Sequence, residues 1–238
     1  MNLDTLDQAF EALKTYDWGA DGSALQPLDE AVVATRADAA ARQALEKRLA
    51  ETLTTGISRD AKDVVCRLLM VIGTAASVPA LASLLADAEL AHMARYALER
   101  IPAPEAAAAM RAALPQLSGL LRVGVIGSLG VRRDVESVPA LAALLDDPDP
   151  AVACAAAVAL GAIRTPDAAA ALAGSSVSHA EVRRATTDAS LACAESLLAG
   201  GQRAEALAIY RRFAGEDQPK HVKLAATRGI LACAGQSQ

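Results

Sequence analysis

A ten-residue pattern of apolar and small residues recurs along the chain. The pattern has an apolar residue at position 1, small residues at positions 5 and 8, Leu at position 9 and Gly at position 10, and the other positions vary. Its three best copies are LRVGVIGSLG, VVCRLLMVIG and VACAAAVALG. Looser copies bring the total to six, and the six starts lie 26, 31, 31, 30 and 40 residues apart. The apolar and small positions fall on one face of a helix with about 3.6 residues per turn. Each copy therefore predicts one amphipathic helix.

A second helical phrase lies between the copies. SVPALASLLAD (77–87) and SVPALAALLDD (137–147) are near duplicates, 60 residues apart. Proline near the start of each phrase is tolerated in the first helical turn, whereas the DDPDP stretch ends the helix and turns the chain. Each repeat is therefore predicted to be helix, turn, helix. Neither helix can bury its apolar face alone, but stacked pairs can.

The phrase SVPALAALLDDPDPAVACAAAVALGAI resembles the HEAT repeat, particularly the short bacterial form first named from phycobilisome lyases. The resemblance covers residues 60–173 well and continues loosely to residue 234. It implies an all-α fold, a right-handed α-solenoid of antiparallel helix pairs with about twelve to fourteen helices and no sheet. In that family the helix before the D-P-D-P turn is outer, and the helix after it lines the concave face. The motif indicates a fold and says almost nothing about function.

The first 56 residues do not fit the template. They read as three helices with breaks near residues 19–23, 35–38 and 56, and we interpret residues 1–56 as a helical cap. A cap is expected because the first repeat would otherwise expose its apolar end. We predict that Trp18 packs inside this cap. The alternative is that Tyr16 and Trp18 face a ligand.

Residues 57–238 are predicted to be one repeat array that forms a continuous solenoid with the cap. Within it, ACAESLLAGGQRAEALAIYRRFAGED (192–217) looks like a tetratricopeptide-type helix pair, with a Gly-Gly turn and an E-A-L-x-x-Y sequence. We interpret it as a locally longer repeat, since no linker rich in Pro, Gly or Ser separates it from the array. We also keep open that the chain is part of a longer multidomain protein.

Composition supports the helical assignment. The apolar fraction is 53%, aromatic residues are 3%, and alanine accounts for 58 of 238 residues. Alanine is the strongest helix former, and a core rich in it requires helices that approach closely. The net charge of −5 and the absence of a basic stripe exclude a typical nucleic-acid binder. The apolar runs are too short and too interrupted for membrane insertion.

Candidate chemistry is sparse. His92, His179 and His221 are far apart and match no metal-ligand spacing, and neither a P-loop nor a G-x-S-x-G motif is present. HEAT-type hydroxylases with a di-iron centre carry His-Glu dipeptides, which this chain lacks. The acids of DDPDP lack the spacing of a calcium loop, so they are expected to cap the next helix. We therefore predict no catalytic residue, no metal and no cofactor.

The four cysteines, Cys66, Cys154, Cys193 and Cys233, are widely spaced in predicted helices. We expect all four to be reduced and largely buried, as small apolar side chains.

The second and seventh template positions flank the apolar stripe and are expected to face the partner. The residues at these positions are Tyr96, Arg122, Arg183, Asp188, Lys223 and Arg228. They form a mixed-charge, aromatic-poor strip that suits a polar protein contact. For the basic residues of the second template position, Arg122, Arg183 and Lys223, the resemblance favours a bond to the turn acid of the neighbouring repeat, as often in HEAT-like arrays, over contact with the partner.

The sequence favours a non-catalytic protein–protein interaction scaffold or adaptor that binds a protein or peptide on its concave face. The alternative is a bilin lyase-like or other HEAT-type enzyme or chaperone that handles a chromophore or cofactor. A HEAT-like alkyl-base glycosylase is a third possibility, but the acidic isoelectric point argues against it. The N-terminal segment lacks the features of a secretory leader, which favours the cytoplasm; a periplasmic location is expected if a leader has been removed.

Overall fold

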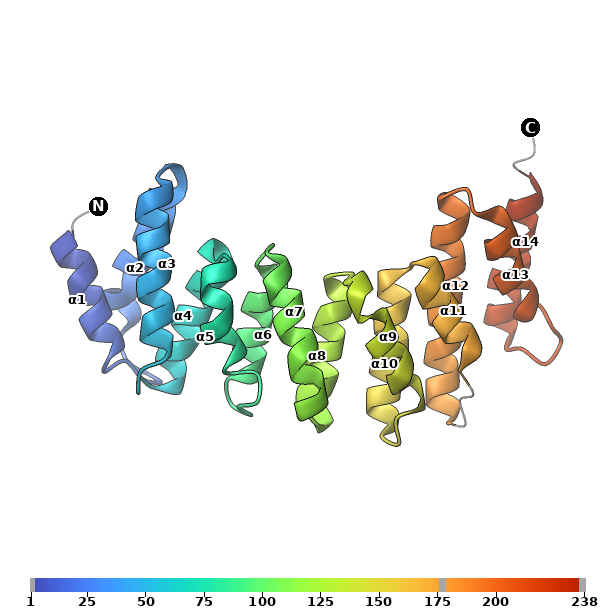
Figure 1. The fold of residues 1–238 in the computed structure, drawn as a ribbon, viewed down its shortest axis with the longest axis horizontal. Helices are drawn as coiled ribbons and strands as arrows, with labels where there is room; N and C mark the ends of the chain where they lie inside the picture. The colour runs from blue at the N-terminus through green and yellow to red at the C-terminus, as the bar shows by residue number, and fades with distance from the viewer. Residues whose placement is uncertain (1–2, 176–178, 236–238) are drawn as a thin grey trace. The chain divides into compact units, whose positions relative to one another are not determined.

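The structure is a computed structural model that describes residues 3–175 and 179–235. Within these ranges the regular structure consists of fourteen α-helices and six short 3-10 helices, with no strand (Figure 1). The number of helices and the absence of a sheet confirm the predicted all-α fold. None of the helices in the described ranges is long and apolar enough to cross a membrane.

The helices group into two compact units, Met1–Leu117 and Ser118–Gln238. Unit 1 contains α1 (Leu3–Leu13), α2 (Gln26–Ala34), α3 (Ala39–Leu53), α4 (Arg59–Ile72), α5 (Val78–Ala82), α6 (Ala91–Arg100) and α7 (Pro104–Ala113). Unit 2 contains α8 (Gly119–Val131), α9 (Val138–Ala143), α10 (Pro150–Ile163), α11 (Pro166–Gly174), α12 (Ala180–Ala199), α13 (Arg203–Arg212) and α14 (Lys220–Gly235). The predicted boundary at residue 56 falls inside unit 1, and a continuous right-handed solenoid stays a prediction.

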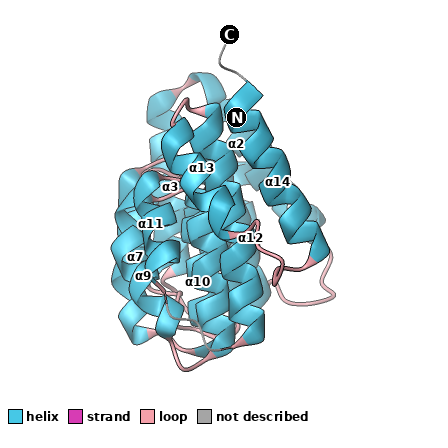
Figure 2. Ribbon diagram, turned by 90° about the vertical axis from the view of Figure 1, so that its right-hand side faces the viewer, coloured by secondary structure: helices cyan, strands magenta, loops and turns pink. Residues whose placement is uncertain are grey.

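Each unit has two rows of helices, which we call the even row and the odd row after the helix numbers. In unit 2, α8 packs on α10 and α10 on α12, while α9 packs on α11. In unit 1, α4 packs on α6 and α5 on α7. Figure 2 shows α9, α11 and α13 on one side of the ribbon and α10, α12 and α14 on the other. All six template copies lie on helices of the even row.

Helix starts follow the capping residues that the turns supply. The side chain of Asp149 accepts a hydrogen bond from Ala151 N at the start of α10, and Pro150 occupies the first helical position. Thr165 caps α11 in the same way, by accepting from Ala168 N. Acceptor side chains satisfy backbone N–H groups that have no partner inside the helix. The DDPDP turn therefore acts as predicted.

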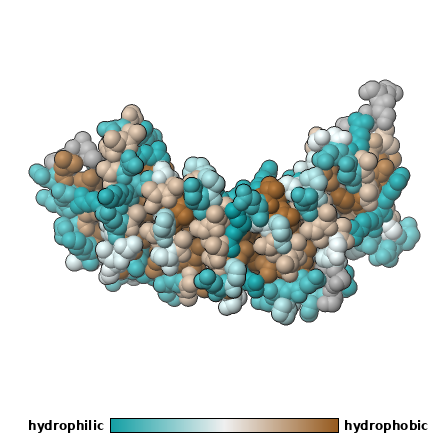
Figure 3. All heavy atoms as spheres, in the orientation of Figure 1, coloured by the Kyte–Doolittle hydropathy of each residue, from teal (hydrophilic) through white to brown (hydrophobic). Residues whose placement is uncertain are grey.

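The core of each unit is aliphatic. The largest fully buried side chains are mostly leucines, such as Leu49, Leu69, Leu81, Leu98 and Leu129. The face seen in Figure 3 carries apolar side chains in small groups separated by polar ones. The cysteine prediction is confirmed for three residues, which are buried with free thiols. Cys154 differs, because it is only half-buried, although its thiol is also free.

The N-terminal segment forms three α-helices, α1 to α3, as predicted, but its aromatic residues do not pack as expected. Phe10 is buried, and the guanidinium of Arg48 lies 3.8 Å from the centre of its ring. Tyr16 is half-buried, and Trp18 is 87% exposed. The prediction that Trp18 packs inside a cap is wrong. One hydrogen bond, from Ser58 Oγ at the start of α4 to the carbonyl of Tyr16, joins its loop to α4, and the indole lies outside the core.

The segment 192–217 forms the last part of α12, a turn at Gly200 and Gly201, and α13. Gly201 has a φ of +81°, in the left-handed region that glycine adopts most easily. α13 packs against both α12 and α14. The longer repeat therefore continues the helix stacking of unit 2.

Candidate partner-binding surface

The seventh template position faces solvent on most helices of the even row. The residues at this position are Met70, Tyr96, Gly127, Val158, Asp188 and Arg228, of which Met70 is half-buried and the others are exposed. The side chain at this position is excluded from the stack because the apolar positions turn toward the neighbouring helices. In unit 2 it forms a surface row that runs across α8, α10, α12 and α14.

A groove of about 650 Å³ lies between α10 and α12 in this row. Gly161, Ala162, Ala185 and Ala189 lie along it, so the two helix backbones approach closely and no large side chain fills the space. Exposed Val158 lines the same groove. The groove results from the small residues of the template rather than from a gap in the core.

Charged side chains of both signs border this groove. Glu181, Arg184 and Asp188 lie three and four residues apart on α12, and therefore on one face of the helix. Arg164 lines the groove from the end of α10, where its φ of +60° places it in the left-handed conformation. Such alternating charge provides specific polar contacts across a protein interface.

A second groove, of about 540 Å³, lies between α12 and α14. Glu195 and Arg228 line it, and Tyr210 of α13 contributes a buried ring. Burial, with a further contribution from the negative charge of Glu195, raises the pKa of Tyr210 to about 12. The phenol therefore stays neutral under ordinary conditions.

The sequence of residues 116–192 matches a family model described as HEAT repeats. This segment consists of HEAT repeats. It contains α8 to α11 and most of α12, and so includes the groove between α10 and α12. The prediction of a HEAT-like repeat family is confirmed.

Two solved structures resemble the chain as a whole. One is the crystal structure of an engineered protein, at 18% identity and a TM-score of 0.45, covering 98% of this chain and 69% of that one. The other is human deoxyhypusine hydroxylase in complex with glycerol, at 16% identity and a TM-score of 0.41, covering 98% and 97% of the two chains. No protein with a curated function matches the sequence.

The six predicted binding residues divide into three groups. Arg183, Asp188 and Arg228 are exposed and line grooves of unit 2. Tyr96 is in unit 1, where its ring lies 4.7 Å from that of His92. The other two residues form ion pairs within unit 2 and are described next.

Arg122 bonds the turn acid of the neighbouring repeat, as the resemblance to HEAT-like arrays implied. Its guanidinium donates to Asp147 Oδ2 at 3.0 Å, and both side chains are mostly buried. Asp147 is the turn acid before α10, and its other oxygen accepts from Asp149 N at 2.9 Å. Lys223 instead bonds Glu216, in the turn before its own helix, at 2.7 Å. The hydrogen bond from Lys223, together with its positive charge, lowers the pKa of Glu216.

The structure adds four charged residues that the sequence reasoning missed: Arg164, Glu181, Arg184 and Glu195. Glu181 and Arg184 could have been found, because they share a helix face with Asp188. Arg164 could not have been found, because the direction of its side chain depends on its own left-handed backbone conformation at the end of α10. Within the described ranges, no group of three His, Cys, Asp or Glu side chains is arranged to hold a metal ion.

Proposed function

We propose that this protein is a non-catalytic interaction scaffold that binds a protein or peptide partner on the even row of unit 2. The observation that carries this proposal is the groove between α10 and α12, lined by small residues and bordered by Glu181, Arg184 and Asp188. Stacked helical repeats build extended surfaces of this kind, on which each repeat contributes a few contacts. The mixed charge suits a partner with a polar surface.

The test is site-specific photo-crosslinking in cells. A photoreactive amino acid at Val158 places the probe in the groove, and the same amino acid at Val135 serves as the control. The two valines are 61% and 51% exposed and both belong to unit 2. We expect a discrete cross-linked partner from position 158 and none from position 135. Identical products from both positions would contradict the proposal.

Charge exchange provides the second arm of the test. The variant Arg184→Glu/Asp188→Arg keeps the net charge and inverts the pattern in the groove, and Asp146→Arg/Arg211→Glu makes the same exchange at exposed residues outside it. We expect the first variant to lose the cross-link and the second to keep it. Thermal unfolding of both variants checks that the fold is retained.

Chromophore handling is a second candidate function. The observation that favours it is a hollow of about 580 Å³ near the starts of α12 and α14, lined by Arg183, Arg184 and His221. Cationic side chains grouped in this way suit the carboxylates of a tetrapyrrole. The test is a titration of the purified protein with biliverdin. A saturable absorbance change that Arg183→Ala/Arg184→Ala abolishes supports this candidate, and its absence excludes binding of this chromophore.

A further inference from the structure

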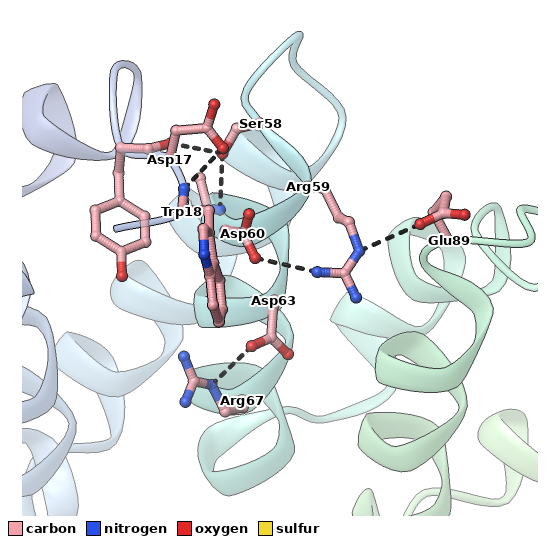
Figure 4. A network of polar contacts seen from close by, with 10 residues as sticks. Asp17, Trp18, Ser58, Arg59, Asp60, Asp63, Arg67 and Glu89 are labelled. Atoms are coloured by element: carbon pink, nitrogen blue, oxygen red, sulfur yellow. Dashed lines mark hydrogen bonds and ion pairs between the residues drawn. The ribbon is translucent and has the colours of Figure 1, made fainter. Parts of the chain in front are cut away.

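Hydrogen bonds hold the backbone beside Trp18, and its side chain lies outside the core of unit 1. It lies in the loop after α1, and Ser58 Oγ donates a hydrogen bond of 2.5 Å to the carbonyl of Tyr16 in the same loop. Trp18 N donates to Asp17 Oδ1 at 2.8 Å, and Gly19, with a φ of +80°, turns the chain directly afterwards. Figure 4 shows these contacts beside the start of α4. A large aromatic ring held outward by a fixed backbone is the type of group that anchors protein contacts.

A groove of about 400 Å³, which we call the Trp18 groove, lies close to this loop between α2 and α4. Tyr16, Leu25 and Val32 line one side, and Leu68 and Val71 line the side formed by α4, while one acid, Asp29, and one base, Arg67, also border the groove. Val71 is 55% exposed, so the apolar lining extends to the surface. The groove has room for a large apolar side chain from another molecule.

The net negative charge of the protein lies in unit 1, and the loop beside this groove is acidic. Unit 1 contains 16 acidic and 11 basic residues, whereas unit 2 contains 12 of each, so the whole net charge of −5 lies in unit 1. Residues 16–30 carry four acids and no base. A patch of one sign attracts segments of the opposite sign and raises their association rate.

The two arginines of α4 are paired with acids. Arg67 bonds Asp63 at 3.4 Å, and Arg59 contacts Asp60 at 3.1 Å and Glu89 at 3.5 Å (Figure 4). In this view the indole of Trp18 is drawn in front of the face of α4 that carries these pairs. Arg59 and Arg67 therefore already have acidic partners.

Three carboxylates of residues 16–30 remain available to a partner: Asp17 and Asp21 in the loop, and Asp29 in the groove lining. Asp17 accepts from the backbone of its own loop, and Asp21 accepts from the backbone and hydroxyl of Ser23. These two hydrogen bonds from Ser23 lower the pKa of Asp21 and keep it ionised. Asp29 lines the groove and forms no ion pair within residues 3–175 and 179–235.

We propose that the Trp18 groove binds a segment of a partner protein in which a large apolar side chain stands beside lysine or arginine. The apolar side chain fills the space between Tyr16 and Val71. The basic side chain lies on the indole of Trp18, where a cation interacts favourably with the ring face. Its charged end meets Asp17, Asp21 or Asp29. This surface belongs to unit 1 and is independent of the surface proposed on unit 2.

The experiment begins with a phage-displayed library of random dodecapeptides selected on the full-length protein. We expect the selected peptides to combine lysine or arginine with leucine, phenylalanine or another large apolar residue. Trp18 is the only tryptophan of the chain, so intrinsic fluorescence reports directly on this site. Binding of a selected synthetic peptide should shift the emission to shorter wavelength and protect the indole from quenching by acrylamide.

Matched variants locate the binding site. Val71→Ser should weaken peptide binding by about tenfold, whereas Val33→Ser, at an equally exposed valine outside the groove, should leave it unchanged. Asp17→Asn/Asp21→Asn keeps the acceptors of the loop, removes two charges and should reduce both the affinity and its dependence on salt. Asp146→Asn/Asp167→Asn in unit 2 is the control for the loss of charge.

Three results would overturn the proposal. They are the selection of acidic peptides, the absence of any binder that changes Trp18 fluorescence, and equal binding to the Val71→Ser and Val33→Ser proteins. Failure of the partner-binding proposal for unit 2 can be distinguished from failure of this one. The exchange Arg184→Glu/Asp188→Arg changes only unit 2 and leaves the Trp18 groove intact.

Discussion

Gly161 of α10 packs directly against the backbone of Ala189 of α12. A Cβ atom built on Gly161 would lie 2.7 Å from both Cα and Cβ of Ala189. The same relationship holds one repeat earlier, where a Cβ on Gly130 would lie 2.8 Å from Cα of Ala159. At these two copies the last template position requires glycine, because the next helix of the even row occupies the space of its side chain.

Replacement of this glycine should therefore destabilise unit 2. Gly161→Ala forces the two helices apart and should lower the free energy of unfolding by about 1–3 kcal/mol. The control is Gly127→Ala on α8, where a Cβ has no neighbour within 4 Å. That change should stabilise the protein by about 0.5–1 kcal/mol, because alanine is the better helix former. Urea unfolding followed by circular dichroism measures both. If both variants are stabilised, the helices can separate without cost and the close-packing argument fails.

The ion pair between Arg122 and Asp147 should contribute measurably to stability. Its side chains are 25% and 12% exposed, so solvent screens the charges only in part. A double-mutant cycle with Arg122→Met and Asp147→Asn should give a coupling energy of about 1 kcal/mol. Asparagine keeps the acceptor for Asp149 N, which separates the ion pair from the turn.

A second cycle on Lys223 and Glu216 is the control for this prediction. Glu216 is 94% exposed, and the coupling in this pair should stay below about 0.5 kcal/mol. Equal coupling energies in the two cycles would show that burial of the Arg122 pair has no energetic consequence.

The repeat architecture could be predicted because apolar spacing determines which face of a helix is buried. The template copies therefore identified the even row, and the DDPDP turn identified the capping acids. The role of Arg122 stayed open because a basic residue at the second position reaches either a turn acid or solvent, and the sequence does not fix the distance to Asp147. In the structure this distance is short enough for a hydrogen bond.

The position of Trp18 could not be predicted from local sequence. Large aromatic residues are mostly buried, and the pattern of residues 1–56 gave no contrary signal. The hydrogen bond that fixes its loop joins Ser58 to Tyr16, 42 residues apart in sequence. Likewise, the groove between α10 and α12 depends on Gly161 and Ala189 meeting in space, which their spacing within one helix does not reveal.

Glu46 should be a strong stabilising contact in unit 1. It is 1% exposed and accepts hydrogen bonds from Thr74 N at 2.6 Å and from Ser77 Oγ at 2.9 Å, which joins α3 to the turn before α5. Glu46→Ala removes the acceptor of the part-buried Thr74 N, whereas Ser77 Oγ keeps its hydrogen bond to the carbonyl of Thr74, and the change should cost about 1–3 kcal/mol. Glu51→Ala, an exposed site on the same helix, should change stability by less than about 0.5 kcal/mol. Equal losses would show that helix propensity, rather than the buried hydrogen bonds, dominates.

Alkaline pH should destabilise the protein through its buried thiols. Burial raises the pKa of Cys66 to about 12 and that of Cys193 to about 11, from an ordinary value of 9.0. Because the folded state holds these protons more tightly than the unfolded state, the free energy of unfolding should fall as the pH rises from about 9 through these values. Cys66→Ala/Cys193→Ala removes both groups and should flatten the decline between pH 9 and 11, even though the cavities lower stability at neutral pH. Urea unfolding midpoints measured across this range test the prediction, and parallel curves for the two proteins would assign the alkaline loss to other groups.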